Sequence, residues 1–154
     1  MKSLKKILGL LSLFLILPSC TTTKTALYDQ YSYQKTTEIK VTSLQLISNA
    51  TTTYSLHKMD ADKLLLEIDK QIEYEKNKPD NEITYAMWQL VRDDEKNVLG
   101  GFIKRWSEKG SFSPIFVDEA KKQVSSAFDV LIQYEVKKDK QSKDVLQELL
   151  SKTN

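Results

Sequence analysis

The sequence has few of the residues that hold metals, form disulfides or break helices. Among its 154 residues there are one cysteine, one histidine, four glycines and three prolines. A single cysteine cannot close an internal disulfide, which excludes a disulfide-stapled fold. One histidine and one cysteine give no zinc-binding pattern, so we expect no metal site and no cofactor-binding site. The scarcity of glycine and proline favours long helices over a many-turned β-sandwich.

The chain contains a short apolar run close to its N-terminus. Three lysines precede residues 7–17, ILGLLSLFLIL. These eleven residues are too few to span a bilayer, which takes about 20 helical residues. Pro18 then ends any helix, and the small residue Ser19 precedes Cys20. This order of a basic start, a short apolar core and a small residue predicts a secretory signal peptide over 1–19.

The residues that end this segment, Leu17, Pro18, Ser19 and Cys20, resemble the lipobox of bacterial lipoproteins. The resemblance implies that the signal is removed and that a diacylglycerol group and an acyl chain are attached to Cys20. An ordinary signal peptide or an uncleaved anchor is the alternative. The lipoprotein interpretation is favoured because lipid attachment removes a free thiol, which is a liability in an oxidising compartment.

Residues 20–26 are expected to form a polar tether between that lipid and the folded part of the chain. Thr21, Thr22 and Thr23 follow Cys20, with no aspartate next to the cysteine. In lipoproteins of Gram-negative bacteria, this resembles the sequence that directs sorting to the outer membrane. We therefore expect a lipid anchor in the outer membrane and a body that faces the periplasm, with exposure on the cell surface as the second choice.

Positive and negative side chains are balanced once the signal is removed. The three signal lysines leave with it, so the mature chain keeps 20 basic and 21 acidic side chains. Domains that bind nucleic acid instead carry a clear excess of basic residues. We therefore expect no nucleic-acid partner, and a soluble body that is held at a membrane by its anchor.

Apolar residues recur at helical spacing in four segments of the chain. The expected helices are 60–77, 82–92, 98–109 and 114–137. The last of them is the most regular, and Ser113 and Pro114 provide a hydroxyl cap and a proline suited to the first helical position.

Two further segments have weaker patterns. Residues 28–54 place apolar and aromatic residues at helical spacing and are expected to be helical, although EIKVT alternates like a strand. A strand near 38–47 is therefore the alternative. Residues 138–154 are expected to be a charged tail, with a short amphipathic helix around 145–150 as an option.

We expect an all-α fold, a small antiparallel bundle of four to five helices in one domain that covers 27–137. Each expected helix is apolar on one side only, so the helices must pack together to be stable. The expected core residues are Leu65, Ile68, Met87, Leu90, Phe102, Trp106, Val124, Phe128 and Leu131.

The sequence contains no recognisable catalytic pattern, and we expect the protein not to be an enzyme. A Ser-His-Asp triad requires His57, which has no motif around it, so a solvent-facing or capping histidine is favoured. Gly100 and Gly101 lack the Lys-Ser/Thr continuation of a phosphate-binding loop. The carboxylates are expected on solvated helix faces and turns rather than paired for acid/base chemistry. Those considered are Glu67, Glu73, Glu75, Asp93, Asp94, Glu108, Asp118 and Glu119.

The segment 98–114, VLGGFIKRWSEKGSFSP, combines glycines with basic and aromatic residues. One interpretation is a partner contact, because arginine and tryptophan are enriched at interaction hot spots. Its candidate contact residues are Phe102, Lys104, Arg105 and Trp106. The favoured interpretation is a tight helix corner, with Trp106 in the core and the basic residues in solvent.

These observations favour a lipid-anchored, non-enzymatic helical lipoprotein that meets the membrane through its anchor and binds another envelope component, expected to be a protein. An adaptor, a subunit of an envelope complex and an exclusion or immunity protein all fit. One alternative is a carboxylate-based hydrolase of cell-wall glycan, which requires two converging acidic residues, at least one with a raised pKa. The other is a carrier of a small apolar ligand, which requires a pocket between helices.

Overall fold

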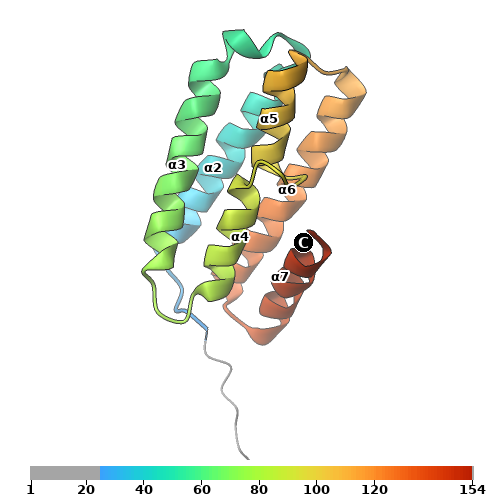
Figure 1. Ribbon diagram of the computed structural model, residues 1–154. Helices are drawn as coiled ribbons and strands as arrows, with labels where there is room; N and C mark the ends of the chain where they lie inside the picture. The colour runs from blue at the N-terminus through green and yellow to red at the C-terminus, as the bar shows by residue number, and fades with distance from the viewer. Residues whose placement is uncertain (1–24, 154) are drawn as a thin grey trace, which may run out of the picture.

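The computed structural model describes residues 25–153, which form a bundle of α-helices (Figure 1). The helices are α2 (Gln30–Ser48), α3 (Lys58–Lys76), α4 (Glu82–Arg92), α5 (Leu99–Lys109), α6 (Pro114–Lys137) and α7 (Lys140–Thr153). Two short 3-10 helices, η2 (Asn49–Thr51) and η3 (Tyr54–Leu56), connect α2 to α3. The predicted signal at 1–19 and the predicted lipid site at Cys20 lie outside the described residues.

The helices confirm the all-α prediction. Residues 25–153 contain six α-helices and no strand, so the strand considered at 38–47 is absent, and those residues lie within α2. Threonine disfavours helix, yet the threonines of α2 direct their hydroxyls to backbone carbonyls one turn earlier, as Thr36 does to Ser32. Within the described range, no helix is long and apolar enough to cross a membrane.

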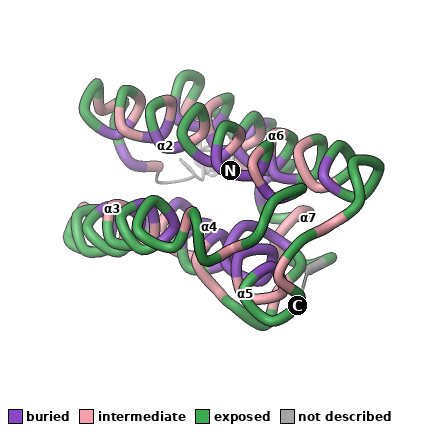
Figure 2. The backbone as a smooth tube through the Cα atoms, turned by 90° about the horizontal axis from the view of Figure 1, so that it is seen from above, coloured by how far each residue is buried: buried purple, intermediate pink, exposed green. Residues whose placement is uncertain are grey.

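The helices form two layers, which are seen from one end in Figure 2. α2 and α6 lie side by side in one layer, and α3, α4 and α5 make up the other. α4 and α5 have 11 residues each and follow one another along the bundle, opposite the 24 residues of α6 (Figure 1). α7 packs against α4 and α6 beside the two layers.

Local capping sets the start of the two helices of the first layer. Asp29 precedes α2, and its side chain accepts a hydrogen bond from the Tyr31 backbone N–H at 2.9 Å. Ser113 caps α6 in the same way through the Phe116 N–H, and Pro114 occupies the first turn, as predicted from the sequence.

α3 begins at Lys58, two residues earlier than expected from the sequence. His57 occupies the position before the helix, and its side chain makes no capping hydrogen bond. The His57 ring instead stacks on Trp106 with the ring centroids 5.5 Å apart, and its Nε2 lies 2.8 Å from Thr52 Oγ1. His57 therefore differs from the expected solvent-facing or capping histidine, because its ring is half-buried against a core tryptophan and caps no helix.

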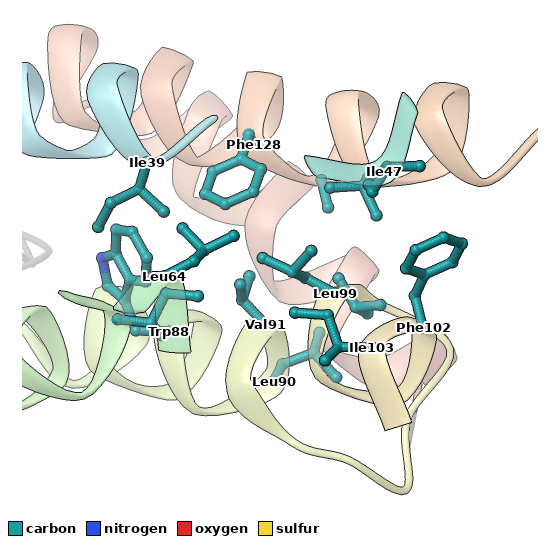
Figure 3. Close-up of a cluster of buried hydrophobic side chains, with 14 of the residues drawn as sticks. Ile39, Ile47, Leu64, Trp88, Leu90, Val91, Leu99, Phe102, Ile103 and Phe128 are labelled. Carbon is teal, nitrogen blue, oxygen red and sulfur yellow. The ribbon is translucent and has the colours of Figure 1, made fainter. Parts of the chain in front are cut away.

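The core lies between the two layers (Figure 3). Ile39 of α2 and Phe128 of α6 point toward Leu64 and Trp88 on the facing helices. Eight of the nine expected core residues are buried, and Leu65 is half-buried because the stripe of α3 that faces the core runs through its neighbour Leu64. Trp88, which was not among the expected core residues, is fully buried and packs edge-on against Phe128.

The C-terminal segment differs from the charged tail expected from the sequence. α7 is a helix of 14 residues, and it brings the number of α-helices in the described range to six instead of four or five. Leu146 is fully buried, and Leu149 and Leu150 are half-buried against the core. Three leucines on one face therefore dock α7 on α4 and α6, and its charged residues remain at the surface.

The connection between α4 and α5 explains two adjacent glycines. A Cβ on Gly100 would lie 2.1 Å from the Arg92 carbonyl oxygen, and a Cβ on Gly101 would lie 1.8 Å from that of Lys96. The loop 93–98 can lie against the start of α5 only because both positions lack a side chain. This close approach is the tight helix corner that the sequence favoured for 98–114.

Candidate functional site

The chain enters the bundle at Thr25, and we call this end of the bundle the base. Thr25 Oγ1 donates a hydrogen bond to the Lys138 carbonyl oxygen at 3.1 Å, and the Ala26 N–H donates to that of Asp80 at 3.0 Å. These bonds hold residues 25–26 between the end of α6 and the turn from α3 to α4. A tether that precedes Thr25 therefore leaves the folded part from the base.

Glu75 lies at the centre of a polar cluster at the base. Its side chain is 0% exposed, and Lys78 Nζ lies 3.1 Å from its Oε2. It also accepts hydrogen bonds from Ser32 Oγ at 2.5 Å, Gln71 Nε2 at 2.6 Å and Asn81 Nδ2 at 2.6 Å. Four donors from α2, α3 and the following turn thus compensate one buried carboxylate for its lost hydration.

Asp29 extends this cluster from the start of α2. Its Oδ2 accepts a hydrogen bond from Tyr74 Oη at 2.7 Å and lies 3.1 Å from Lys78 Nζ. Burial alone would raise the pKa of Asp29, but the hydrogen bonds from Tyr74 and Lys78 outweigh it and lower the pKa to about 2. The same bond to Asp29 raises the pKa of Tyr74 to about 12.

A second buried carboxylate, Glu135 of α6, lies beside the same cluster. Its Oε2 is 2.7 Å from Lys138 Nζ, and its Oε1 accepts a hydrogen bond from the Asp29 N–H at 3.3 Å. The Lys138 ammonium lies over the Tyr134 ring, 4.6 Å from its centroid. Burial, together with Glu135 and Glu82, raises the pKa of Tyr134 to about 12. The base therefore joins α2, α3 and α6 through charged hydrogen bonds.

Sequence analysis placed Glu75 on a solvated helix face, and this expectation is wrong. The buried positions of α3 recur every three or four residues and are Ala61, Leu64, Ile68, Gln71 and Glu75. Glu75 lies four positions after Gln71 on the same buried face of α3, so the helical spacing in the sequence could have predicted its burial. Glu135 continues the buried stripe of α6 in the same way, four positions after Leu131. The contact of Glu135 with Asp29 has no such signal, because it joins residues 106 positions apart in the chain.

An open groove follows the outer face of α6 and has a volume of about 700 Å³. Its apolar lining comes from three helices, with Leu44 on α2, Val130 on α6 and Val145 on α7. Ser125 and Ser126 lie in the middle of the α6 face, where their small side chains leave room. The volume falls within the range of about 300–1,000 Å³ that is usual for ligand pockets. The sequence did not predict this groove, because it depends on how α2 and α7 flank α6.

The two aromatic candidates of the segment 98–114 are not at the surface. Phe102 and Trp106 are both fully buried. Trp106 Nε1 donates to the carbonyl oxygens of Thr52 and Gly110, each at 3.1 Å. Neither ring is available to a partner, which corrects the partner-contact interpretation for these two residues.

The two basic candidates of the same segment are partly exposed and already have partners within the chain. Lys104 forms an ion pair with Glu95, and Arg105 donates a hydrogen bond to Asn97 Oδ1. Both partners belong to the loop before α5. Lys104 and Arg105 therefore hold this loop against the helix, as the helix-corner interpretation implies.

The end of the bundle opposite the base exposes large apolar side chains. Met59, Ile115 and Leu56 are 84%, 79% and 75% exposed, and Phe116 is exposed to a smaller extent. Leu56 and Met59 lie where η3 meets α3, and Ile115 and Phe116 lie at the start of α6 (Figure 1). We call these four side chains the distal apolar residues. Apolar side chains that gather in one contiguous patch are typical of interaction surfaces, and this end of the bundle brings together four of them from three elements.

Four of the described carboxylates have a shifted pKa, and in each of them the shift is downward. Asp29 and Glu67 have pKa values lowered to about 2, in Glu67 through hydrogen bonds from Lys35 and Lys70. The pKa of Asp139 is lowered by hydrogen bonds from Ser142, and that of Glu148 by Lys152. A general acid needs a raised pKa. Residues 25–153 also hold no group of three or more histidine, cysteine or acidic side chains placed to bind a metal ion.

Comparison with protein-family models, with curated proteins and with solved structures gave no match to this chain. The lipobox resemblance and three features of the fold are what indicate a function for this chain. These are the base where the tether leaves, the groove on α6 and the distal apolar residues.

Proposed function

We propose that the chain is a lipid-anchored, non-enzymatic protein of a bacterial envelope, held in the outer membrane through Cys20 and facing the periplasm, where it binds another envelope protein. The observation that carries this proposal is the lipobox-like sequence from Leu17 to Cys20, which contains the single cysteine of the chain. The hydrogen bonds of Thr25 and Ala26 support it, because a tether that leaves from the base connects the lipid to one end of the bundle.

The distal apolar residues support the binding part of the proposal. α6 has 24 residues and is about 36 Å long. Met59 and Ile115 therefore lie a helix length from the tether, where a partner in the periplasm can reach them. Anchoring raises the local concentration of the protein at the membrane, so a small apolar contact of this kind suffices for association.

The anchor is tested by feeding cells an alkyne-labelled fatty acid and isolating the tagged protein. We expect the native chain to incorporate the label and to fractionate with the outer membrane, and Cys20→Ser to do neither. Ser19→Ala keeps a small residue before the cysteine and is the matched control, which should retain the label. A native chain that carries no label would contradict the proposed anchor.

The binding site is tested with a photo-crosslinking amino acid placed at Met59 or Ile115 in cells. We expect both positions to give the same adduct, and Lys76, which is also exposed but lies near the base, to give none. The double variant Met59→Ser with Ile115→Ser should lose that partner in affinity capture without a change in membrane anchoring. Adducts from Lys76 alone would move the contact away from the distal end.

The groove on α6 supports a second candidate function, the binding of a small apolar ligand. Its lining is predominantly apolar and its volume is that of a ligand pocket. The test is titration of a fluorescent fatty-acid analogue into the mature chain, residues 20–154 with Cys20→Ser. Saturable binding that Val130→Lys abolishes would support a carrier, and the absence of saturable binding would remove this candidate.

A further inference from the structure

The groove on α6 is elongated along the helix. The α6 residues that line it extend from Lys121 to Lys137. These residues are 16 positions apart, which corresponds to about 24 Å along the helix. Its apolar lining residues are Leu44, Val130 and Val145. An extended hydrocarbon chain fits this shape better than a compact ligand does.

The charged residues of the groove lie at its edges and do not call for a charged occupant. Asp129 lines the groove but forms an ion pair with Lys40 of α2. Lys121, Lys122 and Lys137 also line it, and lysine stems cover apolar surface while their ammonium groups stay in water. The groove is therefore suited to a neutral aliphatic chain with a solvated rim.

The lower end of the groove lies beside the point where the tether leaves the fold. Lys137 lines the groove, and the carbonyl oxygen of the next residue, Lys138, accepts the hydrogen bond from Thr25 Oγ1 at 3.1 Å. Cys20 precedes Thr25 by five positions. Five extended residues reach about 17 Å, which is less than the length of the groove. A lipid on Cys20 therefore begins within reach of the end of the groove near Lys137.

From this arrangement we infer that the groove holds one acyl chain of the lipid on Cys20 when the protein is away from a bilayer. The inference rests on the proposed lipidation and gives the groove a specific occupant. Attachment through a tether this short gives the acyl chain a high effective concentration at the groove, which favours it over free lipid. In a bilayer the chain is buried completely, so the open groove releases it there.

A single added thiol tests this occupancy. Lipidation blocks the thiol of Cys20, so Ser126→Cys places the only free thiol of the mature lipoprotein in the middle of the groove. Ser107→Cys is the matched control, since Ser107 is an exposed serine of α5 that does not line the groove. Each variant is prepared lipidated and as residues 20–154 with Cys20→Ser, and alkylation rates are measured at low concentration after detergent removal.

We expect the thiol at position 126 to react about tenfold more slowly in the lipidated form, because only the uncovered minority is alkylated. Transfer into phosphatidylethanolamine–phosphatidylglycerol vesicles should restore the rate, and position 107 should react equally in both forms. Equal rates at position 126 in a chain that mass spectrometry shows to be lipidated would overturn the inference and leave the anchor intact. A chain without lipid in that spectrum would overturn the proposed function itself.

Two other occupants give different results in the same experiment. Protection at position 126 that disappears on dilution would assign the groove to a second copy of the chain and overturn the inference. Protection of the Cys20→Ser form by added palmitate, with none from the attached lipid, would assign it to free fatty acid and also overturn it. Adding the substitution Val130→Lys to the lipidated Ser126→Cys chain should remove the protection at position 126. Protection that persists in this double variant would count against an acyl chain in the groove.

Discussion

At the scale of single residues, the polar cluster at the base is the feature whose energetics the structure defines best. Asp29 and Glu75 both accept hydrogen bonds from Ser32 and lie within ion-pair distance of Lys78. Because these polar groups share partners, the stability of the fold depends on the presence of every member of the cluster.

Asp29 links the stability of the fold to acid pH. Its pKa falls from 3.8 to about 2 on folding, so its contribution is complete above the unfolded value and is lost as the pH falls through about 2. The contribution amounts to about 2 kcal/mol. We expect Asp29→Asn, which retains a capping side chain for α2, to flatten the loss of unfolding free energy between pH 4 and pH 2. Urea unfolding at each pH measures the free energy of unfolding, and Asp94→Asn, a substitution at an exposed position, is the control. If the free energy of unfolding changes with pH equally in the native chain and in both variants, Asp29 is not the source of the acid dependence.

Removal of the Glu75 side chain should be costly. Glu75→Ala leaves Lys78, Ser32, Gln71 and Asn81 without their common acceptor at the base. We expect a loss of about 3 kcal/mol in the free energy of unfolding, which is usual when one partner of a buried charged pair is removed. Glu73→Ala, two positions earlier and exposed, should change it by less than about 0.5 kcal/mol. Similar values for the two variants in chemical denaturation would show that the carboxylate of Glu75 is not buried.

At the scale of whole elements, α7 is the helix that differs most from the prediction made from the sequence. The segment 138–154 is rich in lysine, and such charge favours solvent exposure over packing. The burial of Leu146 against α4 and α6 makes this segment part of the core and provides one wall of the groove through Val145. The domain therefore extends past the boundary at 137 that the sequence suggested.

Two adjacent residues of α7 distinguish a docked helix from a frayed tail. We expect Leu146→Ala to lower the free energy of unfolding by about 3 kcal/mol, because it removes a fully buried side chain. Val145→Ala, at a position that is 46% exposed, should cost less than about 1 kcal/mol. Thermal and urea unfolding measure both effects. If the two substitutions cost the same small amount, α7 contributes no core packing.

At the scale of the whole molecule, the fold has two unlike ends. Hydrogen bonds to the backbone carbonyl oxygens of Lys138 and Asp80 fix residues 25–26 at the base, whereas Met59 and Ile115 are exposed at the distal end. A protein anchored through its N-terminal lipid is therefore held with one end toward the bilayer. This polarity separates the membrane contact from the proposed contact with a partner.

Fluorescence quenching by the bilayer tests this orientation. With the lipidated form reconstituted in vesicles with quencher-labelled head groups, we expect a dye on Lys140→Cys, at the base, to be quenched more than one on Met59→Cys. The expected separation is about one length of α6, or 36 Å. In the unlipidated form both dyes should be quenched equally and weakly. Stronger quenching at position 59 in the lipidated form would show that the distal end faces the membrane.

The sequence by itself determined the all-α fold and the positions of most helices, and it is the basis for the proposed lipid anchor. These features depend on local information, namely the spacing of apolar residues, the Ser113 and Pro114 helix start and the order of residues before Cys20. Most of the expected core was buried for the same reason, since a one-sided helix has one face to bury.

Only the tertiary structure decided the contents of the base, the docking of α7 and the groove on α6. Each depends on contacts between residues that are far apart in the chain, such as the 106 positions between Asp29 and Glu135. The tertiary structure also confirmed the expected burial of Phe102 and Trp106 and removed the alternative that they are surface contacts. An aromatic residue beside lysine and arginine has the same sequence pattern in both cases, and the helices packed around it determine whether solvent reaches it.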